Sequence, residues 1–293
     1  YVVASSSGGI SKLDNVGTMV NKGIEISLGA SIIKTEDWDW DVSLIYSRNR
    51  NTVNKLGTPR IQIANDTGAP VWHVEGQPAS VFFGTYYARD DQGNILKTAD
   101  GQFYQERGNA STNVPERDPA TGLPYQTGNS AGLIRKIIGN PNPDYTASLS
   151  TTVRYKGLVF STLFDAVQGF SVFNADRRTR QGIGNGEYAE KEMKGELPRG
   201  YIWSMYSIEE WRIEDGSFVK LREMSLSYNL PKIIKGINSL QLSLIGRNLY
   251  SWDNYGGYDP ETNAGNNSDR FRATDFGNVP IPRSYQLRLT ANF

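Results

Sequence analysis

The sequence predicts an all-β fold, an antiparallel transmembrane β-barrel. Three observations support this prediction. Apolar and polar residues alternate along much of the chain, short turns alternate with long loops, and the polar positions of the alternating segments hold mainly Ser, Thr, Gln and Asn. Strict alternation is typical of strands that have one apolar and one polar face.

The alternation is plain in the first strand that we expect, residues 23–33. Ile24, Ile26 and Leu28 fall on one side of an extended chain, and Glu25 and Ser27 fall on the other. The same pattern predicts strands in six further segments: 38–48, 145–155, 158–167, 218–228, 239–249 and 284–293. In the last of these, "SYQLRLTANF", the odd-numbered residues form the apolar face.

Helical signal is limited to two short segments. The stretches "GEYAEKEMKGEL" (186–197) and "IEEWRI" (208–213) are expected to form short helices. With so little helix, the predicted strands must be joined as antiparallel hairpins.

The connections between the predicted strands fall into two classes. Three are short, namely 34–37, 155–157 and 231–238, whereas three are long and rich in Gly, Asn, Asp and Pro, at roughly 90–143, 168–216 and 251–283. Short turns at one end and long loops at the other are typical of outer-membrane barrels. A soluble β-sandwich that binds glycans is the alternative, although a sandwich distributes its loops more evenly.

Two further features favour the barrel. A sheet that faces bulk water would carry more Lys and Glu on its polar side, whereas Ser and Thr suit a hydrated lumen. Aromatic residues lie towards several strand ends, as the interfacial girdles of a barrel require. These residues are Trp38, Trp40, Tyr46, Tyr145, Tyr155, Tyr228, Tyr250, Trp252 and Tyr285.

The direction of each strand can be counted back from the carboxyl end. If the last strand runs inward, all three long loops lie outside. Segment 79–89 ("ASVFFGTYYAR") is then expected to run outward, like 38–48, so a returning strand must lie between them. Residues 59–66 ("PRIQIAND") are the candidate, which gives at least nine strands.

Composition excludes several classes of function. The 293 residues carry no net charge, which argues against nucleic-acid binding, and they include no cysteine and a single histidine, His73. No apolar run is long enough for a membrane-spanning helix. The chain begins without methionine or a signal segment, so we expect a fragment or a processed product.

No catalytic or metal site is predicted. The acidic pairs Glu209–Glu210, Glu214–Asp215 and Asp90–Asp91 point to opposite faces of a strand or lie in solvated loops. The loop that begins at Asp90 lacks the acidic spacing of a calcium hand, so turn formation is the preferred interpretation and calcium is the lesser alternative.

Binding is more plausible than catalysis. Loop aromatic residues can stack on sugar rings or pack on a peptide, and arginines can meet acidic groups on cargo or on lipopolysaccharide; the alternative is that they pack the loops. The candidate ligand-binding residues are Trp203, Tyr206, Trp211, Tyr255, Tyr258, Arg270 and Arg272, with Arg177, Arg178 and Arg180 as further cationic residues.

Five segments, taken in order, resemble one known family. They are "DNVGTMVNKGIEISLGASII" (14–33), the strand pair joined by "YKG" (138–174), "IEDGSFVKLREMSLSYNLP" (213–231), "LIGRNLYSWDNYGGYDPE" (244–261) and "VPIPRSYQLRLTANF" (279–293). Together they are similar to the SusC-like (SusC/RagA) TonB-dependent transporters of Bacteroidota. Lys220 stands where arginine is usual in that family's motif.

The resemblance implies a location and a function. Residues 1–293 would be the carboxy-terminal part of a roughly 22-stranded outer-membrane barrel, with the plug domain, the TonB box and the earlier strands absent from this chain. It implies TonB-energised import of an oligosaccharide or oligopeptide, without enzymatic activity or cofactor, under a SusD-like surface lipoprotein. The barrel would contact lipid and lipopolysaccharide, and Phe293 would be the assembly signal.

Overall fold

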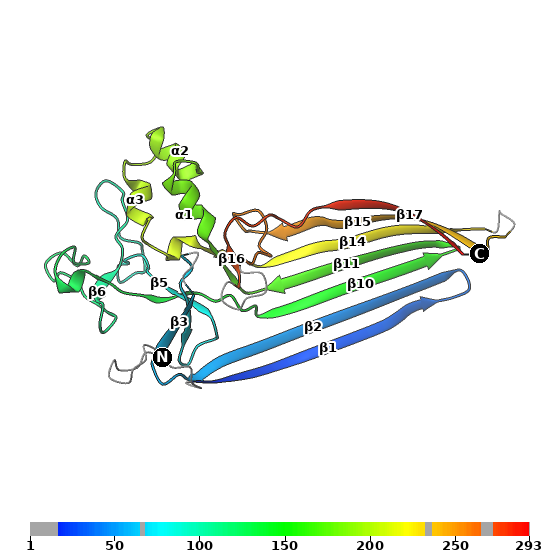
Figure 1. The fold of residues 1–293 in the computed structure, drawn as a ribbon, viewed down its shortest axis with the longest axis horizontal. Coiled ribbons are helices and arrows are strands. Elements are labelled where there is room, and N and C mark those ends of the chain that lie inside the picture. Colours follow the sequence, from blue (N-terminus) through cyan, green and yellow to red (C-terminus); the bar gives the residue numbers. More distant parts are fainter. Residues whose placement is uncertain (1–16, 65–67, 232–235, 265–271, 293) are drawn as a thin grey trace, which may run out of the picture.

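Seven long strands lie side by side in one antiparallel sheet (Figure 1). The structure, a computed structural model, describes residues 17–64, 68–231, 236–264 and 272–292. Neighbours in the sheet follow the order β1-β2-β10-β11-β14-β15-β17. Their bounds are β1 (Thr18–Lys34), β2 (Trp38–Lys55), β10 (Tyr145–Tyr155), β11 (Leu158–Gln168), β14 (Phe218–Leu230), β15 (Ser239–Asp253) and β17 (Ser284–Asn292). All seven strands predicted by alternation are therefore present.

The register of these strands brings apolar residues together on one face. Leu44 of β2 lies opposite Leu149 of β10, and Leu244 of β15 lies opposite Leu287 of β17. Because side chains alternate along a strand, one aligned pair places every second residue of both strands on that face. We call this the apolar face of the sheet.

The other face carries a network of polar side chains, and we call it the polar face. The Ser148 hydroxyl donates to Asp165 Oδ1 at 2.6 Å across β10 and β11. Nearer the turns, the Arg154 guanidinium lies 2.7 Å from Asp41 Oδ2 and 3.1 Å from Asp39 Oδ1. Short polar groups thus satisfy one another across neighbouring strands.

The apolar face has no covering layer among the described residues. Leu287 is 72% exposed, and Leu244 and Leu28 are also exposed. A sandwich would bury these leucines against a second sheet, but the three other sheets of the described chain lie beyond one end of the long strands (Figure 1). The sandwich alternative is therefore wrong, and the sheet has the two-sided character of a barrel wall.

Turns and loops separate to opposite ends of the sheet. The turn at residues 35–37 and the turn at 156–157 lie at one end, as do the end of β14 and the start of β15 (Figure 1). Lys156 and Gly157 both have positive φ, 45° and 88°, which a two-residue hairpin turn requires. The long connections 56–144, 169–217 and 254–283 all leave from the other end, so the predicted segregation is confirmed.

Aromatic residues cluster near both ends of the strands. At the turn end, the rings of Trp38 and Tyr155 lie 4.2 Å apart. At the loop end, Tyr46 stacks on Tyr145 at 5.6 Å, and Tyr250 lies 4.7 Å from Trp252. Amphipathic rings at both ends of an apolar band suit the two interfaces of a membrane.

Two expected barrel strands lie elsewhere. β2 pairs directly with β10, so the whole of 56–144 is one excursion from the sheet. Residues 59–66 and 79–89 instead contribute to a small sheet of order β3-β4-β5-β9, made of β3 (Arg60–Ala64), β4 (Val71–Val74), β5 (Val81–Gly84) and β9 (Lys136–Gly139). All four residues of β5 are buried, which suits a loop core and not a wall with one lipid face. In the described residues the main sheet therefore has seven strands, whereas at least nine were expected.

The remaining elements also belong to the loops. One small sheet comprises β6 (Arg107–Asn109), β7 (Val114–Pro115) and β8 (Gly132–Leu133), and another comprises β12 (Ser171–Asn174), β13 (Ile213–Asp215) and β16 (Thr274–Asp275). The helices are α1 (Ala175–Gly182), α2 (Glu187–Met193) and α3 (Tyr201–Met205), with single 3₁₀ turns η2 (Asn129–Ala131) and η3 (Glu210–Arg212). α2 and η3 confirm the two predicted helical segments. Within the described ranges, no helix is both long and apolar enough to cross a bilayer.

The two faces of β17 give a direct test. Replacing Leu287 with arginine places a charge on the apolar face and should lower the free energy of unfolding in lipid vesicles by about 2–4 kcal/mol. Gln286→Arg, one residue away on the polar face, should change it by less than about 1 kcal/mol. Urea unfolding of the whole protein in vesicles measures both, and an equal loss for the two variants would contradict the assignment of the faces.

Candidate functional site

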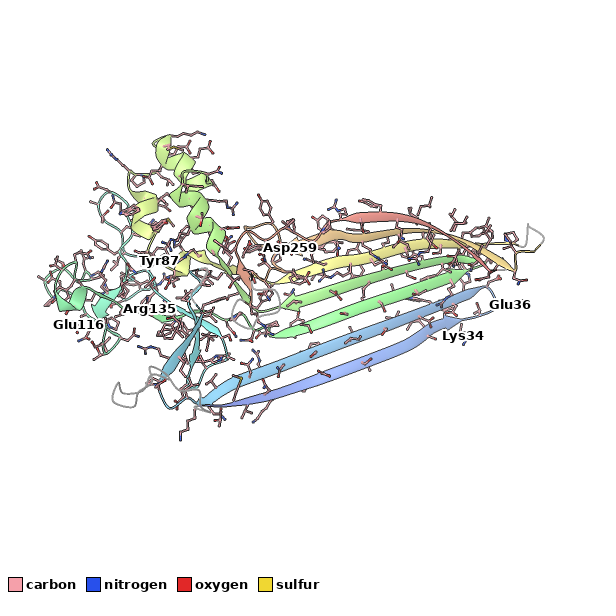
Figure 2. The ribbon with its side chains drawn as sticks, viewed as in Figure 1. Lys34, Glu36, Tyr87, Glu116, Arg135 and Asp259 are labelled. Carbon is pink, nitrogen blue, oxygen red and sulfur yellow. The ribbon has the colours of Figure 1, made fainter. Side chains whose placement is uncertain are left out.

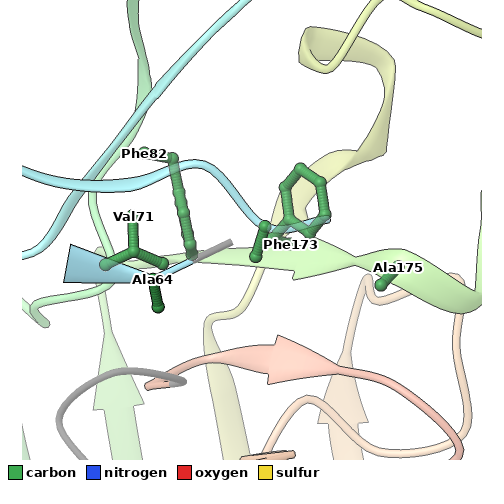
Figure 3. Close-up of a cluster of buried hydrophobic side chains, with 6 residues drawn as sticks. Ala64, Val71, Phe82, Phe173 and Ala175 are labelled. Atoms are coloured by element: carbon green, nitrogen blue, oxygen red, sulfur yellow. The ribbon is translucent and has the colours of Figure 1, made fainter. Parts of the chain in front are cut away.

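The three long loops pack into one body at the loop end of the sheet, and we call it the loop layer. Its central cluster contains Val71, Phe82 and Phe173, which come from two different long loops (Figure 3). The Phe82 and Phe173 rings lie 5.7 Å apart. A second buried cluster joins Tyr87 to Ile208. The loops therefore form a structured layer with its own hydrophobic core.

The Glu209–Glu210 pair joins two of these loops. Glu209 Oε2 accepts from the Thr85 amide at 2.7 Å, and Glu210 Oε2 accepts from the Tyr87 amide at 2.9 Å. Glu210 also pairs with Arg89 at 3.1 Å. Burial raises the pKa of the Tyr87 phenol well above its usual range, with the nearby Glu210 carboxylate contributing. Both carboxylates are occupied in loop packing.

Two of the candidate ligand-binding residues form an aromatic platform, in which Trp203 is exposed and Tyr206 is half-buried. Trp203 of α3 is 78% exposed, and its ring is stacked on Tyr206 at 5.4 Å with an interplanar angle of 19°. They border a groove of about 480 Å³ that also contacts Met193 and Ile202. Flat rings beside an open groove can pack against a sugar ring or an apolar side chain.

Two other candidates are buried in the loop layer. Trp211 is 6% exposed and belongs to the second cluster, and Tyr255 is 8% exposed. In this conformation neither ring offers a surface to a ligand. Arg272 is exposed and donates to Asn142 Oδ1 at 3.3 Å, whereas Arg270 lies outside the described residues.

Tyr255 makes a buried hydrogen bond that ties the third long loop together. Its hydroxyl donates to Asp275 Oδ2 at 2.7 Å, and the Thr262 hydroxyl contacts Asp275 Oδ1 at 3.4 Å. Burial raises the pKa of the Asp275 carboxyl, an effect that the Tyr255 hydrogen bond partly opposes. Burial, followed by the hydrogen bond to Asp275, raises the pKa of Tyr255 far above its usual range.

Tyr258, by contrast, is exposed beside a charged anchor. Lys220 of β14 is buried, and its ammonium lies 2.5 Å from Asp259 Oδ1 and 3.0 Å from Glu261 Oε2. Arg222 bridges Glu261 to Asp165 of the sheet at 2.7 and 2.9 Å. Asp259 lies where the loop layer meets the long strands (Figure 2). The polar face thus holds residues 259–261 in place, next to a cavity of about 280 Å³.

The residues considered for metal binding have other partners. Asp90 Oδ1 accepts from the amides of Gln92 and Asn94 at 3.0 and 2.7 Å, which makes a turn. His73 Nδ1 accepts from the Ser80 amide at 3.0 Å. No group of three or more acidic, histidine or cysteine side chains suited to a metal occurs in the described part of the chain.

Comparisons of sequence relate the chain to known receptors. No family model matches it. TonB-dependent receptor P3 of Formosa agariphila is 28% identical over 315 residues, which cover 98% of this chain and 30% of the receptor. TonB-dependent receptor SusC of Bacteroides thetaiotaomicron is 22% identical over 273 residues, 86% of this chain and 25% of SusC.

Comparisons of structure give the same result for the fold. The structure of the RagAB peptide transporter superposes with a TM-score of 0.71 at 23% identity, over 100% of this chain and 31% of that one. The open-open state of the RagAB peptide importer matches with a TM-score of 0.71 at 21% identity. The chain is similar in sequence to TonB-dependent receptors, SusC among them, and similar in fold to the RagAB transporter.

The relationship fixes a location. TonB-dependent receptors are outer-membrane β-barrel proteins, so this SusC-like chain belongs to the outer membrane, in agreement with its two-faced sheet. The chain spans about a third of the length of the curated relatives with which it aligns. In the described residues, β1 and β17 do not pair with each other, so the sheet is open and not a closed barrel.

The Tyr255–Asp275 bond generates a prediction. Tyr255→Phe removes the donor to Asp275 Oδ2, one of the groups that bind this buried carboxylate, and should weaken the local structure of the loop layer by about 1–3 kcal/mol. Hydrogen exchange of the amides around residues 255 and 275 measures this loss as faster exchange. Tyr258→Phe removes a hydroxyl from an exposed ring of the same loop and should leave exchange unchanged. Equal rates in the two variants would show that the buried bond does not hold the loop.

Proposed function

We propose that residues 1–293 form the carboxy-terminal part of the barrel domain of an outer-membrane nutrient importer. The single observation that supports this most strongly is the two-faced sheet whose three long loops all leave from one end. In this proposal the apolar face meets lipid, the polar face lines the lumen, and the loop layer lies outside the cell. Phe293, which is outside the described residues, would be the assembly signal.

The proposed transport step is uptake energised by TonB acting on a part of the receptor that precedes this chain. The cargo is an oligosaccharide or an oligopeptide. The name of the RagAB peptide transporter supports a peptide, but at 23% identity the likeness bears on the fold. The proposed chain has no enzymatic role, because the acidic pair that is best placed in the loops, Glu209–Glu210, is committed to packing.

The loop layer is proposed to contact a SusD-like lipoprotein and the cargo. Ile183, Met193 and Trp203 are large apolar side chains on or beside the three helices, and each is more than 70% exposed. The helices project from one side of the loop layer, at the upper left of Figure 1. Exposed apolar groups gathered in one region mark an interaction site. Lipid and lipopolysaccharide are the proposed surroundings of the apolar face.

Uptake in cells tests the proposed transport. Cells that carry the full-length receptor should accumulate a fluorescent oligosaccharide or oligopeptide pool, and the accumulation should stop when the receptor gene is deleted or when TonB is inactivated. If accumulation continued at the same rate without TonB, energised import by this receptor would be refuted. The class of the accumulated pool identifies the cargo.

Trp203 tests the proposed role of the aromatic platform. Trp203→Ala in the full-length receptor should weaken binding of the imported cargo or of the lipoprotein by tenfold or more, because truncating a central interface tryptophan costs about 2 kcal/mol. Trp203→Phe keeps a flat ring and should lose far less. Titration calorimetry with each partner separates the two roles, and unchanged affinity for both partners would remove Trp203 from the site.

A further inference from the structure

Two arginine side chains from different elements converge in the loop layer. Arg178 comes from α1 and Arg212 from η3. A β-carbon placed on Gly68 would lie 3.7 Å from Nη1 of Arg212 and 3.8 Å from Nη1 of Arg178. Both guanidinium groups therefore approach one point. Gly68 has φ of 74° and no side chain, so Gly68 itself places no atom at this point.

Aromatic rings hold both guanidinium groups by their faces. Arg212 Cζ lies 4.6 Å from the centre of the Phe173 ring, and Phe173 belongs to the central cluster shown in Figure 3. Arg178 Cζ lies 4.3 Å from the centre of the Tyr206 ring. A guanidinium stacked on a ring keeps its N–H groups at the edge of its plane. Those N–H groups are the donors that recognise planar anions.

The guanidinium groups of Arg178 and Arg212 lack hydrogen-bond acceptors. The Nε–H groups of Arg178 and Arg212 are both buried and donate to no acceptor. Among the residues that the structure describes, neither guanidinium has an ion pair or a side-chain hydrogen bond. Arg212 is only 2% exposed. A buried donor without an acceptor, and more so a buried charge, is costly unless a ligand completes it.

The nearest acidic group does not complete them. Glu209 favours the charged form of Arg212, but Glu209 Oε2 already accepts from the Thr85 amide at 2.7 Å and lies 4.0 Å from Arg135 Nε. Burial, with the neighbouring Arg178 charge, lowers the pKa of Arg212 to about 10. Arg212 therefore remains a cation at neutral pH, and the Glu209 carboxylate that favours its charge already has other partners.

We propose that Arg178 and Arg212 form a binding site for a carboxylate of the imported cargo. A carboxylate accepts paired N–H groups from an arginine fork, and here two forks face one open point beside Gly68. The carboxylate is that of a uronate in an acidic oligosaccharide, or the side chain or carboxyl terminus of a peptide. This inference rests on the proposed function, because it names the chemical class of the cargo.

The position of Tyr206 links this site to the aromatic platform. Tyr206 stacks on exposed Trp203 and also carries the Arg178 guanidinium. A cargo ring on Trp203 and a carboxylate at the arginine pair therefore contact side chains that touch one another. The two together select a cargo that has both a flat apolar surface and an acidic group.

Titration of the full-length receptor in detergent tests the site. The probes are a trigalacturonate with its fully methyl-esterified form, and an acidic tripeptide with its amidated, uncharged form. The acidic member of one pair should bind tenfold or more tightly than its neutral counterpart, and the pair in which this occurs identifies the source of the carboxylate. Equal affinities within both pairs would overturn the proposal.

Variants assign the effect to these residues. Arg178→Gln should weaken the acidic probe by about tenfold and leave its neutral counterpart unchanged. Lys191→Gln removes a cation of the neighbouring helix α2 that pairs with Glu187, and it should alter neither. Gly68→Asp supplies a carboxylate at the open point and should abolish the preference for the acidic probe while the melting temperature is kept. An acidic preference that survives both Arg178→Gln and Gly68→Asp would refute the site. Because TonB-dependent uptake is measured separately, the carboxylate site can fail while the transport function stands.

Discussion

The structure depends on one constraint, the alternation of side chains in register across seven paired strands. In a bilayer, backbone N–H and C=O groups must form hydrogen bonds within the protein, and strand pairing provides them. The register of each pair must also place the apolar side chains of both strands on the same face of the sheet. Apolar residues lie opposite one another at every step from β2 to β17. The aligned pairs are Leu44–Leu149, Leu149–Phe164, Phe160–Leu226, Leu226–Leu244 and Leu244–Leu287. A shift of one residue in any strand would place serine and aspartate in lipid.

The loop layer follows from that constraint. With the strands committed to the membrane, the long connections emerge at one end and must satisfy their own polar groups there. They do so with a shared core around Phe82 and Phe173, and with carboxylates such as Glu209 that bind the backbone of another loop. Lys220 and Arg222 then join this layer to the polar face of the sheet.

Much of the sheet could be predicted from the sequence, because period-two alternation is a direct consequence of one apolar and one polar face. The prediction that residues 79–89 form a strand of the main sheet was wrong. All residues of β5 are buried, and a short apolar run does not indicate which sheet a strand joins. α1 could not be predicted from apolar periodicity because its sequence, ADRRTRQG, has few apolar residues; its first turn is capped instead by the Asn174 side chain. Aromatic residue type selected Trp203, Trp211 and Tyr255 alike as candidates, and it could not separate exposed Trp203 from the two buried rings. Nothing in the sequence singled out Arg212, since its partner is brought near only by the packing of α1 against η3.

The most direct test of the two-faced sheet uses the absence of cysteine from the chain. Single cysteines placed at each position from 146 to 153 of β10, in the full-length receptor in lipid vesicles, can carry a nitroxide label. Collision rates with oxygen, which partitions into lipid, and with a water-soluble nickel chelate then report the surroundings of each side chain. Our account predicts high oxygen accessibility at the odd positions and higher nickel accessibility at the even ones. A profile without a period of two, or with the two sets reversed, would contradict it.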